Sequence, residues 1–299
     1  MHDVCIVGAG PAGLNAALLL GRCRRRVVVF DSGKPRNAAS RGLHGYLTRD
    51  GVLPVDLRKL GRGELARYPT VEVRDESVID VARRETRFEI RTASGASVTA
   101  RILLLATGRV DLLPERPGFA ELYGRGVYHC PFCDGWEHSD EPLVAFGRNP
   151  AAFETALELL TWSSNVTLCS DGPSELDPRQ QRRLADNNIA LIQHPVAELK
   201  PGKSGMLERI HFANGDSIYC RGLFFVSACP QKSSLPEYLG CELDDTGAVR
   251  CNGNASTNVP GLFVAGNVRC GLHLAIMAAA EGAEAAVAIN EVLLESDLR

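Results

Sequence analysis

The chain has 299 residues and a mass of 32.3 kDa, enough for one large domain or two moderate ones. Its 45% hydrophobic content supports a buried core and excludes a chain that is disordered throughout; 33 basic and 36 acidic residues leave a net charge of −3. This balance argues against a nucleic-acid or anionic-membrane partner, which would need a basic excess. No apolar run approaches the roughly 18 residues of a membrane span. No basic segment precedes the first apolar stretch, so we expect no signal peptide and a cytoplasmic location.

The first forty residues predict a dinucleotide-binding unit. An apolar strand, Val4–Val7, runs into Gly8-Ala9-Gly10-Pro11-Ala12-Gly13 and then into an alanine- and leucine-rich helix. A second strand, Arg26–Phe30, ends at Asp31. A G-x-G-x-x-G turn between strand and helix, with an acidic residue about 20 positions further on, is typical of such βαβ units.

Each glycine of this turn has its own expected task. Gly8 permits the tight turn, Gly10 lets the backbone approach a pyrophosphate, and Gly13 allows the helix to pack closely against the strand. The helix N-terminus attracts the phosphates. Asp31 is expected to accept hydrogen bonds from the hydroxyls of an adenosine ribose.

Residues 71–108 are predicted to form short alternating strands, among them 87–91 and 98–100. They end in a separate, buried strand over 102–106 that is followed by Thr107-Gly108. The Pro- and Gly-rich stretch 109–126 is a predicted loop and a candidate domain boundary.

After this loop the organisation repeats. A strand at 142–146 leads into a turn at Gly147 and a helix through Leu160, and a further strand at 165–169 ends near Asp171. Gly147 and Asp171 are 24 residues apart, against 23 between the corresponding residues of the first unit. We interpret this as an internal duplication whose second copy has lost glycines. The tail, 260–267, is another strand and turn, and a helix is expected from about Ala275 to Leu294.

Ten cysteines are present, and only Cys130 and Cys133 have a C-x-x-C spacing. Such a pair can close into a disulfide and reopen by thiolate exchange. Half of a zinc site is one alternative, but it needs a second pair, and Cys220, Cys229, Cys241 and Cys251 do not provide that spacing; we therefore expect no metal. Unreactive core cysteines are the other alternative, and it is the expected state of the remaining eight.

Two histidines flank the pair. His129 and His138 are candidates for proton transfer at the thiols, although a lone histidine is more often structural.

Four segments together resemble the bacterial low-molecular-weight thioredoxin reductase family of flavoproteins: Gly8–Gly13, Ala106–Gly108, Cys130–Gly135 and Gly261–Asn267. The resemblance implies an α/β fold of two Rossmann-like, three-layer domains, the second inserted into the first, and a homodimer. The expected FAD-binding domain is residues 1–113 and 252–299, and the expected redox domain, similar to a pyridine-nucleotide domain, is residues 114–251. The stretch 43–51 looks like a branch that includes dithiol oxidases.

The resemblance also implies roles for residues. Cys133 faces the flavin and forms the charge-transfer thiolate, Cys130 attacks the substrate disulfide, and Asp134 shuttles the proton. The residues implied for FAD binding are Gly8, Gly10, Pro11, Ala12, Gly13, Asp31, Ser32, Arg36, Asn37, His44, Val78, Thr107, Gly108, Gly266, Asn267, Leu274 and Ala275.

The chain departs from the family in its second nucleotide site, which consists of Gly147, Asn149, Ala152 and Asp171. Asn149 stands where a glycine would let the pyrophosphate approach. The arginines that would bind the 2′-phosphate of NADPH are absent at 170–172, and Asp171 would repel that phosphate. Two lost charge-assisted contacts would weaken NADPH binding by about 3–6 kcal/mol, or roughly 10²–10⁴ in affinity.

Three occupants of this second site stay open: NADH, a second flavin or other adenine nucleotide, or nothing. In the last case electrons would come from a protein such as ferredoxin or leave to dioxygen. The residues expected at the flavin also differ from those of the family. Gly266-Asn267 replaces the family's Gly-Asp, and His273-Leu274 replaces its Arg-Gln pair.

We therefore predict an FAD-dependent disulfide/dithiol oxidoreductase, without NADPH as its reductant, that acts on a thioredoxin-like protein or a small molecule. Two alternatives remain: a small-molecule dithiol oxidase that uses dioxygen, and a non-catalytic flavin or redox sensor. The same two cysteines can serve either direction of transfer.

Overall fold

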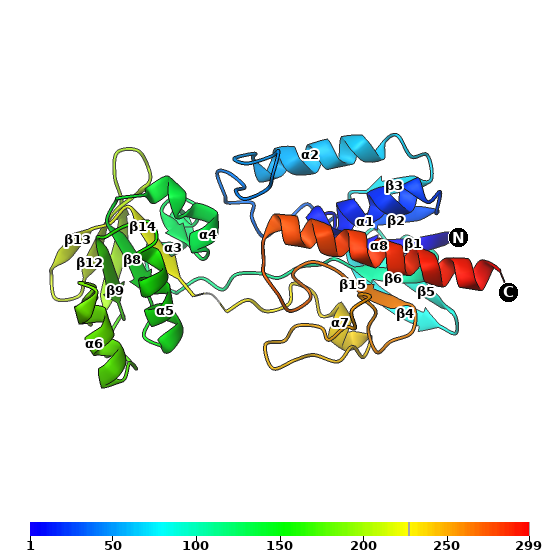
Figure 1. Cartoon of the computed structure of the whole chain (residues 1–299). Coiled ribbons are helices and arrows are strands. Elements are labelled where there is room, and N and C mark those ends of the chain that lie inside the picture. The colour runs from blue at the N-terminus through cyan, green and yellow to red at the C-terminus, as the bar shows by residue number, and fades with distance from the viewer. Residues whose placement is uncertain (227, 299) are drawn as a thin grey trace. The chain divides into compact units, whose positions relative to one another are not determined.

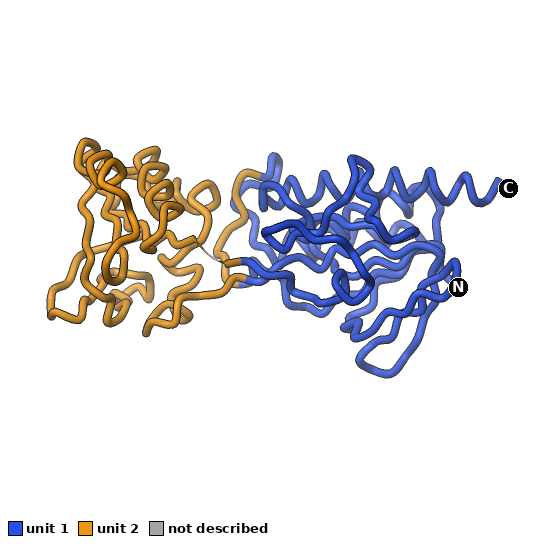
Figure 2. Tube along the Cα trace, turned by 90° about the horizontal axis from the view of Figure 1, so that it is seen from below, with its two compact units in different colours: residues 1–38, 46–110, 229–299 blue, residues 39–45, 111–228 orange. Residues whose placement is uncertain are grey.

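The computed structural model describes residues 1–226 and 228–298. The chain divides into two compact units (Figure 2). The first contains residues 1–38, 46–110 and the chain from 229 onward, and the second contains residues 39–45 and 111–228. The predicted α/β class, with two Rossmann-like units and one inserted into the other, is confirmed.

The first unit is built on a sheet with the order β3-β2-β1-β6-β5-β4, in which β15 also pairs with β6 (Figure 1). Its strands are β1 (His2–Val7), β2 (Val27–Phe30), β3 (Val71–Arg74), β4 (Val78–Arg84), β5 (Arg87–Thr92), β6 (Ser97–Leu105) and β15 (Leu262–Val264). The strands β3, β2, β1, β6 and β15 pair in parallel. The central residues of β2, β1, β15 and the second half of β6 are almost fully buried, as expected of a sheet covered on both faces, whereas the edge strand β3 is only partly buried.

The strands expected at 98–100 and 102–106 are one continuous strand, β6. One side of β6 pairs parallel with β1, as Val7 with Leu105. The other side pairs antiparallel with β5 in the first half of the strand, as Phe88 with Ala100, and parallel with β15 in the second half. A change of partner along the strand, with no break in it, produced two different sequence patterns.

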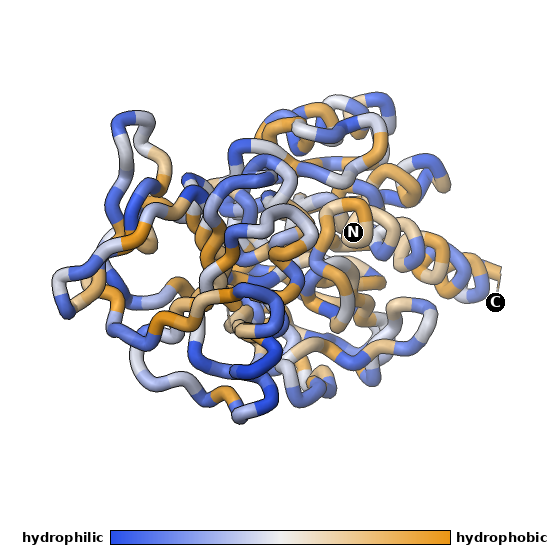
Figure 3. The backbone as a smooth tube through the Cα atoms, turned by 60° about the vertical axis from the view of Figure 1, so that its left-hand side comes forward, coloured by the Kyte–Doolittle hydropathy of each residue, from blue (hydrophilic) through white to orange (hydrophobic). Residues whose placement is uncertain are grey.

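Helices α1 (Pro11–Arg22) and α8 (Ala275–Asp297) lie side by side over this sheet (Figure 1). Alternating apolar and polar residues along α8 are visible in Figure 3, and its buried face includes Ala279, Gly282 and Ile289. A Cβ at Gly282 would lie 2.1 Å from the carbonyl oxygen of Ala12, so this glycine permits the close approach of the two helices. The unit also contains α2 (Pro54–Leu65) and α7 (Leu235–Tyr238).

The second unit contains a parallel sheet with the order β10-β9-β8-β14-β7 and an antiparallel sheet β11-β12-β13. Its strands are β7 (Val127–Tyr128), β8 (Leu143–Phe146), β9 (Val166–Cys169), β10 (Ala190–Ile192), β11 (Val196–Pro201), β12 (Leu207–Phe212), β13 (Ser217–Tyr219) and β14 (Gly222–Phe225). Its helices are α3 (Phe119–Leu122), α4 (Pro131–Asp134), η1 (Trp136–His138), α5 (Pro150–Leu159) and α6 (Pro178–Asp186).

The predicted duplication is present in the strand order. In each unit the first strand of the βαβ motif is paired on one side with its second strand and on the other with a later strand of the same unit. The loop expected at 109–126 contains α3, because Phe119 and Leu122 are buried in the core of the second unit.

The limits of the compact units differ from the expected domain boundaries. Residues 229–251 belong with the first unit, because Leu235, Cys241 and Val249 pack into the core beneath its sheet. Residues 39–45, from the loop after β2, belong with the second. No helix within residues 1–226 or 228–298 has the length and apolar character needed to span a bilayer.

The contact between α1 and α8 gives a first prediction. Gly282→Ala forces a methyl group against the Ala12 carbonyl and should lower the free energy of unfolding by about 1–3 kcal/mol. Gly63→Ala on α2 has no atom within 4 Å of its new Cβ and should leave stability unchanged or raise it by up to about 1 kcal/mol. Urea denaturation of both variants measures their free energies of unfolding. Equal values would contradict the close packing of α1 against α8.

Candidate redox site and nucleotide cradles

The carboxyl ends of four parallel strands form one edge of the first unit. The register places Val7 beside both Phe30 and Leu105, and Leu105 beside Val264. The segments that follow these strands therefore meet at that edge, which is where open α/β sheets bind ligands. They contain Gly8–Gly13, Asp31, Thr107-Gly108 and Gly266-Asn267, all predicted for FAD binding.

The glycines of the first turn differ in what surrounds them. Gly8 has φ +112°, and a Cβ there would lie 2.2 Å from the carbonyl oxygen of Ala106. A Cβ at Gly13 would lie 1.8 Å from the carbonyl oxygen of Gly8. At Gly10, the residue before α1, no heavy atom lies within 4 Å of a built Cβ. Gly8 and Gly13 thus serve close packing, whereas Gly10 leaves open space in front of the helix N-terminus.

The same edge contains polar groups that suit a bound cofactor. The hydroxyl Oγ1 of Thr107 is buried and finds no hydrogen-bond partner among the described residues. The backbone N–H of Gly266 donates to Glu281 Oε2 at 2.8 Å, which fixes the turn after β15. An open phosphate turn and an orphaned buried hydroxyl at one edge fit FAD.

Asp31 is held by two arginines that the sequence reasoning did not find. Its Oδ1 accepts from the Gly33 N–H at 2.9 Å, and its Oδ2 accepts from Arg58 and from Arg62, the latter at 2.5 Å. Burial opposes ionisation of Asp31, but the Gly33 hydrogen bond and the guanidinium groups outweigh it, so its pKa is held below the ordinary value. Arg58 and Arg62 are four residues apart on α2, a spacing that places them on one helix face.

The other residues predicted for FAD binding are placed as follows. Arg36 lies 3.1 Å from His273 Nδ1 and donates to Cys229 Sγ at 3.1 Å, within the first unit. Leu274 is the residue before α8 and Ala275 is its first residue. Ser32 and Asn37 lie in the loop after β2, and Val78 begins β4 and pairs with Thr92. His44 belongs to the second unit, where its Nε2 lies 3.3 Å from Glu137 Oε1.

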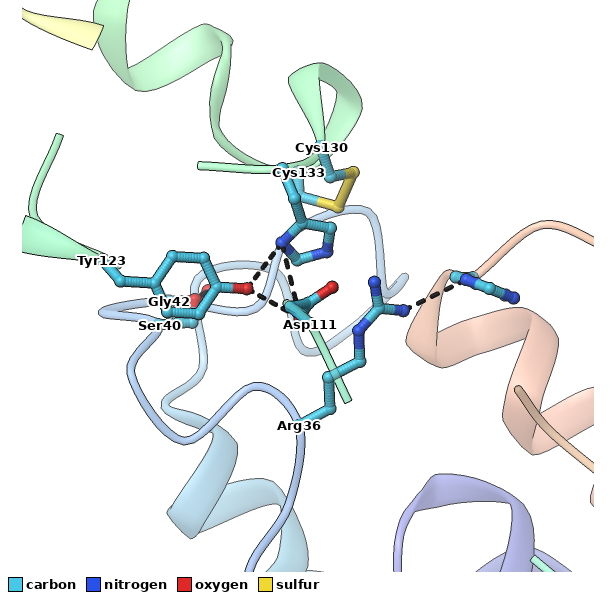
Figure 4. The surroundings of a disulfide bond; sticks show 9 residues. Arg36, Ser40, Gly42, Asp111, Tyr123, Cys130 and Cys133 are labelled. Carbon is cyan, nitrogen blue, oxygen red and sulfur yellow. Dashed lines mark hydrogen bonds and ion pairs between the residues drawn. A yellow bond between two sulfur atoms is a disulfide. The ribbon is translucent and has the colours of Figure 1, made fainter. Parts of the chain in front are cut away.

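Cys130 and Cys133 form a disulfide (Figure 4). The short helix α4 positions the pair, because Cys130 precedes its first residue, Pro131, and the Cys133 N–H donates to the Cys130 carbonyl at 3.1 Å. Phe132, between the cysteines, and Trp136, just after them, are 68% and 77% exposed. Two large aromatic side chains thus lie exposed next to the disulfide in sequence.

Asp134 directly follows Cys133 in α4. Burial, with a smaller contribution from the nearby carboxylate of Glu137, raises its pKa to about 7. A carboxyl group with this pKa can both release and accept a proton near neutral pH, as an acid–base group for thiols requires.

The two flanking histidines have different surroundings. His138 is buried, with Nε2 3.1 Å from the Tyr128 hydroxyl and Nδ1 3.1 Å from Glu141 Oε2. His129 Nδ1 lies 2.8 Å from the hydroxyl of Tyr123. The sequence indicated both histidines but neither of their tyrosine partners, which no short motif connects to them.

In the turn after β8, which we call the second cradle, two side chains of the predicted second nucleotide site make contacts within the unit. Asn149 accepts from the Ala152 N–H at 3.2 Å and so caps α5, at the position that corresponds to Gly10. Asp171 Oδ1 accepts from the Val196 N–H at 2.7 Å, and Oδ2 lies 3.0 Å from Arg116 Nη2. The carboxylate at the end of β9 is therefore already engaged. Among the described residues, no group of three or more His, Cys, Asp and Glu side chains is arranged to hold a metal ion.

Comparisons with known proteins agree with this geometry. Residues 2–282 match the family described as pyridine nucleotide-disulphide oxidoreductase. A probable thioredoxin reductase of Arthroderma benhamiae is 31% identical over 89% of this chain and 74% of its own. The thioredoxin reductase aclD of Aspergillus oryzae is 31% identical over 97% of this chain and 95% of its own. The crystal structure of a putative thioredoxin reductase from Bacillus anthracis has a TM-score of 0.94 and 33% identity, covering 99% of this chain and all of the other.

Because the space at Gly10 is open, we expect a substitution there to weaken FAD binding without changing the stability of the protein. Gly10→Ala should leave the midpoint of urea unfolding unchanged, because its Cβ meets no atom. It should weaken FAD binding at least about tenfold, since the methyl group enters the space that a pyrophosphate needs. Flavin fluorescence on titration of apoprotein measures the dissociation constant, with Gly63→Ala as control; unchanged affinity would contradict this use of Gly10.

The raised pKa of Asp134 predicts a pH-dependent stability. The folded state disfavours the carboxylate, so its stability should fall as pH rises from the unfolded value near 3.8 through the folded value of about 7. Asp134→Asn cannot ionise, so its melting temperature should exceed that of the wild type by more at pH 8 than at pH 5. Asp186→Asn, exposed on α6, is the control. A difference in melting temperature between Asp134→Asn and the wild type that does not change with pH would contradict the raised pKa of Asp134.

Proposed function

The chain belongs to the pyridine nucleotide-disulphide oxidoreductase family, with thioredoxin reductases among its relatives, and from this premise we propose its electron path. It is a flavin-dependent oxidoreductase that acts on sulfur groups. We propose that two electrons pass between FAD in the first unit and the Cys130–Cys133 pair, and then to or from an external disulfide. The disulfide between these two cysteines is the observation that carries the proposal.

The chemistry at the pair is two thiolate exchanges. The Cys130 thiolate attacks the external disulfide, forms a mixed disulfide and releases one thiolate. The Cys133 thiolate then attacks the Cys130 sulfur, closes the pair and releases the second thiolate. The external disulfide is reduced, the pair is oxidised, and two protons must reach the two leaving groups; in the opposite direction an external dithiol is oxidised.

FAD supplies the two-electron acceptor or donor that resets the pair. The residues of the first cradle suit its binding: Gly10 and the N-terminus of α1 for the pyrophosphate, and Thr107 and the Gly266-Asn267 turn at the adjoining strands. Asp31 can still contribute to ribose binding through the one remaining lone pair of Oδ1, although its Oδ2 is shared by Arg58 and Arg62.

We propose further that NADPH is not the reductant. The Asn149 cap occupies the turn that a pyrophosphate would approach, and Asp171 is held by Arg116 and the Val196 N–H. A nucleotide would have to break these interactions before it gained its own, and a 2′-phosphate would approach the carboxylate of Asp171. This arrangement favours an electron donor that does not use the second cradle, such as a ferredoxin.

The same arrangement favours a second candidate function. If the second cradle serves no donor, the pair is suited to remove electrons from an external dithiol, which the flavin passes to dioxygen. Phe132 and Trp136 are exposed beside the pair and offer an apolar surface to a small organic dithiol. Hydrogen peroxide formed during turnover of a small dithiol would distinguish this oxidase from a disulfide reductase.

Anaerobic stopped-flow mixing tests the donor. With NADPH or NADH the flavin absorbance should persist for many seconds, while dithionite, which reduces flavin directly, should bleach it. Reduced ferredoxin is mixed with the protein in the same way, as a further candidate electron donor. Rapid bleaching by NADPH would overturn the proposal that the second cradle has lost its donor.

A further inference from the structure

The residue before the redox pair, His129, takes part in a hydrogen-bonded chain with Tyr123 and Asp111. The Tyr123 hydroxyl donates to Asp111 Oδ2 at 2.7 Å and lies 2.8 Å from His129 Nδ1 (Figure 4). The Asp111 side chain is only 3% exposed, whereas that of His129 is 26% exposed. A buried carboxylate thus lies at one end of the chain and a partly exposed imidazole at the other.

The direction of these hydrogen bonds determines the tautomer of His129. An ionised carboxylate can only accept, so the single hydroxyl proton of Tyr123 is used toward Asp111. The Tyr123 oxygen then accepts from His129, which requires the proton on Nδ1. In the neutral imidazole the basic lone pair is therefore on Nε2.

Packing fixes the tyrosine that makes this arrangement. Tyr123 directly follows α3, and its ring makes an edge contact with Phe225 of β14 at a centroid distance of 6.2 Å. The Asp111 carboxylate, 3.9 Å from His129 Nδ1, also stabilises a positive charge on the imidazole. Both effects favour a histidine that takes up a proton at Nε2.

His138 provides the contrast within the same unit. Both of its ring nitrogens are in hydrogen bonds, with Tyr128 and Glu141, and its side chain is buried. It carries the structural role that a histidine in a core usually has. His129 differs in exposure and in the carboxylate behind its tyrosine.

We propose that Tyr123 and Asp111 are positioning residues that hold His129 as the Nε2 base for the Cys130 thiol. The inference rests on the proposed disulfide exchange. His129 takes the proton of Cys130 as the thiolate forms, and returns it to the first thiolate that leaves the external disulfide. The second leaving thiolate is protonated from Asp134, so two proton carriers serve the two leaving groups.

The test measures the Cys130 thiol and not turnover. In a Cys133→Ser background, iodoacetamide alkylation of Cys130 is followed against pH by peptide mass spectrometry. Tyr123→Phe keeps the ring, and Asp111→Asn keeps the size of the side chain. Each should raise the apparent pKa of Cys130 by about one unit, which slows alkylation about tenfold at a pH below that pKa. Tyr219→Phe, exposed in β13, should have no effect.

A second comparison tests whether Tyr123 acts on Cys130 through His129. In a His129→Gln background, Tyr123→Phe should have no further effect on the alkylation profile, because no imidazole is left to orient. Unchanged profiles in both Tyr123→Phe and Asp111→Asn, or the same slowing with and without His129, would overturn the inference. A different result, disulfide turnover by the Cys130→Ser variant, would contradict the proposed function.

Discussion

The parallel register of β2, β1, β6 and β15 is the constraint on which the rest of the molecule depends. It aligns Phe30, Val7, Leu105 and Val264, so strands from the two ends of the chain finish at the same edge. Because β15 must return to pair with β6, everything between residues 111 and 228 can form a separate compact unit. The glycine turn, the Thr107 hydroxyl and the Gly266-Asn267 turn become neighbours only through this pairing.

The turn before α1 and the turn before α5 occupy equivalent positions in the two units, but their residues differ. Gly10 leaves open space before α1, whereas Asn149, at the matching position before α5, uses its side chain to cap its own helix. At the end of the second strand, Asp31 and Asp171 are both held by arginines and by a backbone N–H, that of Gly33 for Asp31 and that of Val196 in β11 for Asp171. The turn before α1 is open in front of the helix N-terminus, whereas the turn before α5 contains the Asn149 cap.

Local signals explain what could be predicted from the sequence. The glycine turns, the C-x-x-C spacing and the duplicated βαβ pattern each lie within about 30 residues, and all three are present in the fold. Features that depend on distant packing could not be predicted. Residues 229–251 join the first unit through Leu235 and Val249. Strand β6 is continuous because β15 follows β5 as the partner on one of its sides, while β1 pairs with the other side. Asp111 and Tyr123 are separated by α3, so only the folded chain shows that they meet His129.

We propose that electrons pass between external thiols and the flavin through Cys130 and Cys133. The most direct measurement is the anaerobic reduction of the bound flavin by excess dithiothreitol, followed by its visible absorbance, in the wild type and in Cys130→Ser. We expect rapid bleaching in the wild type and a loss of at least about a hundredfold in rate in the variant, which keeps its FAD. Bleaching at the same rate in both proteins would contradict it.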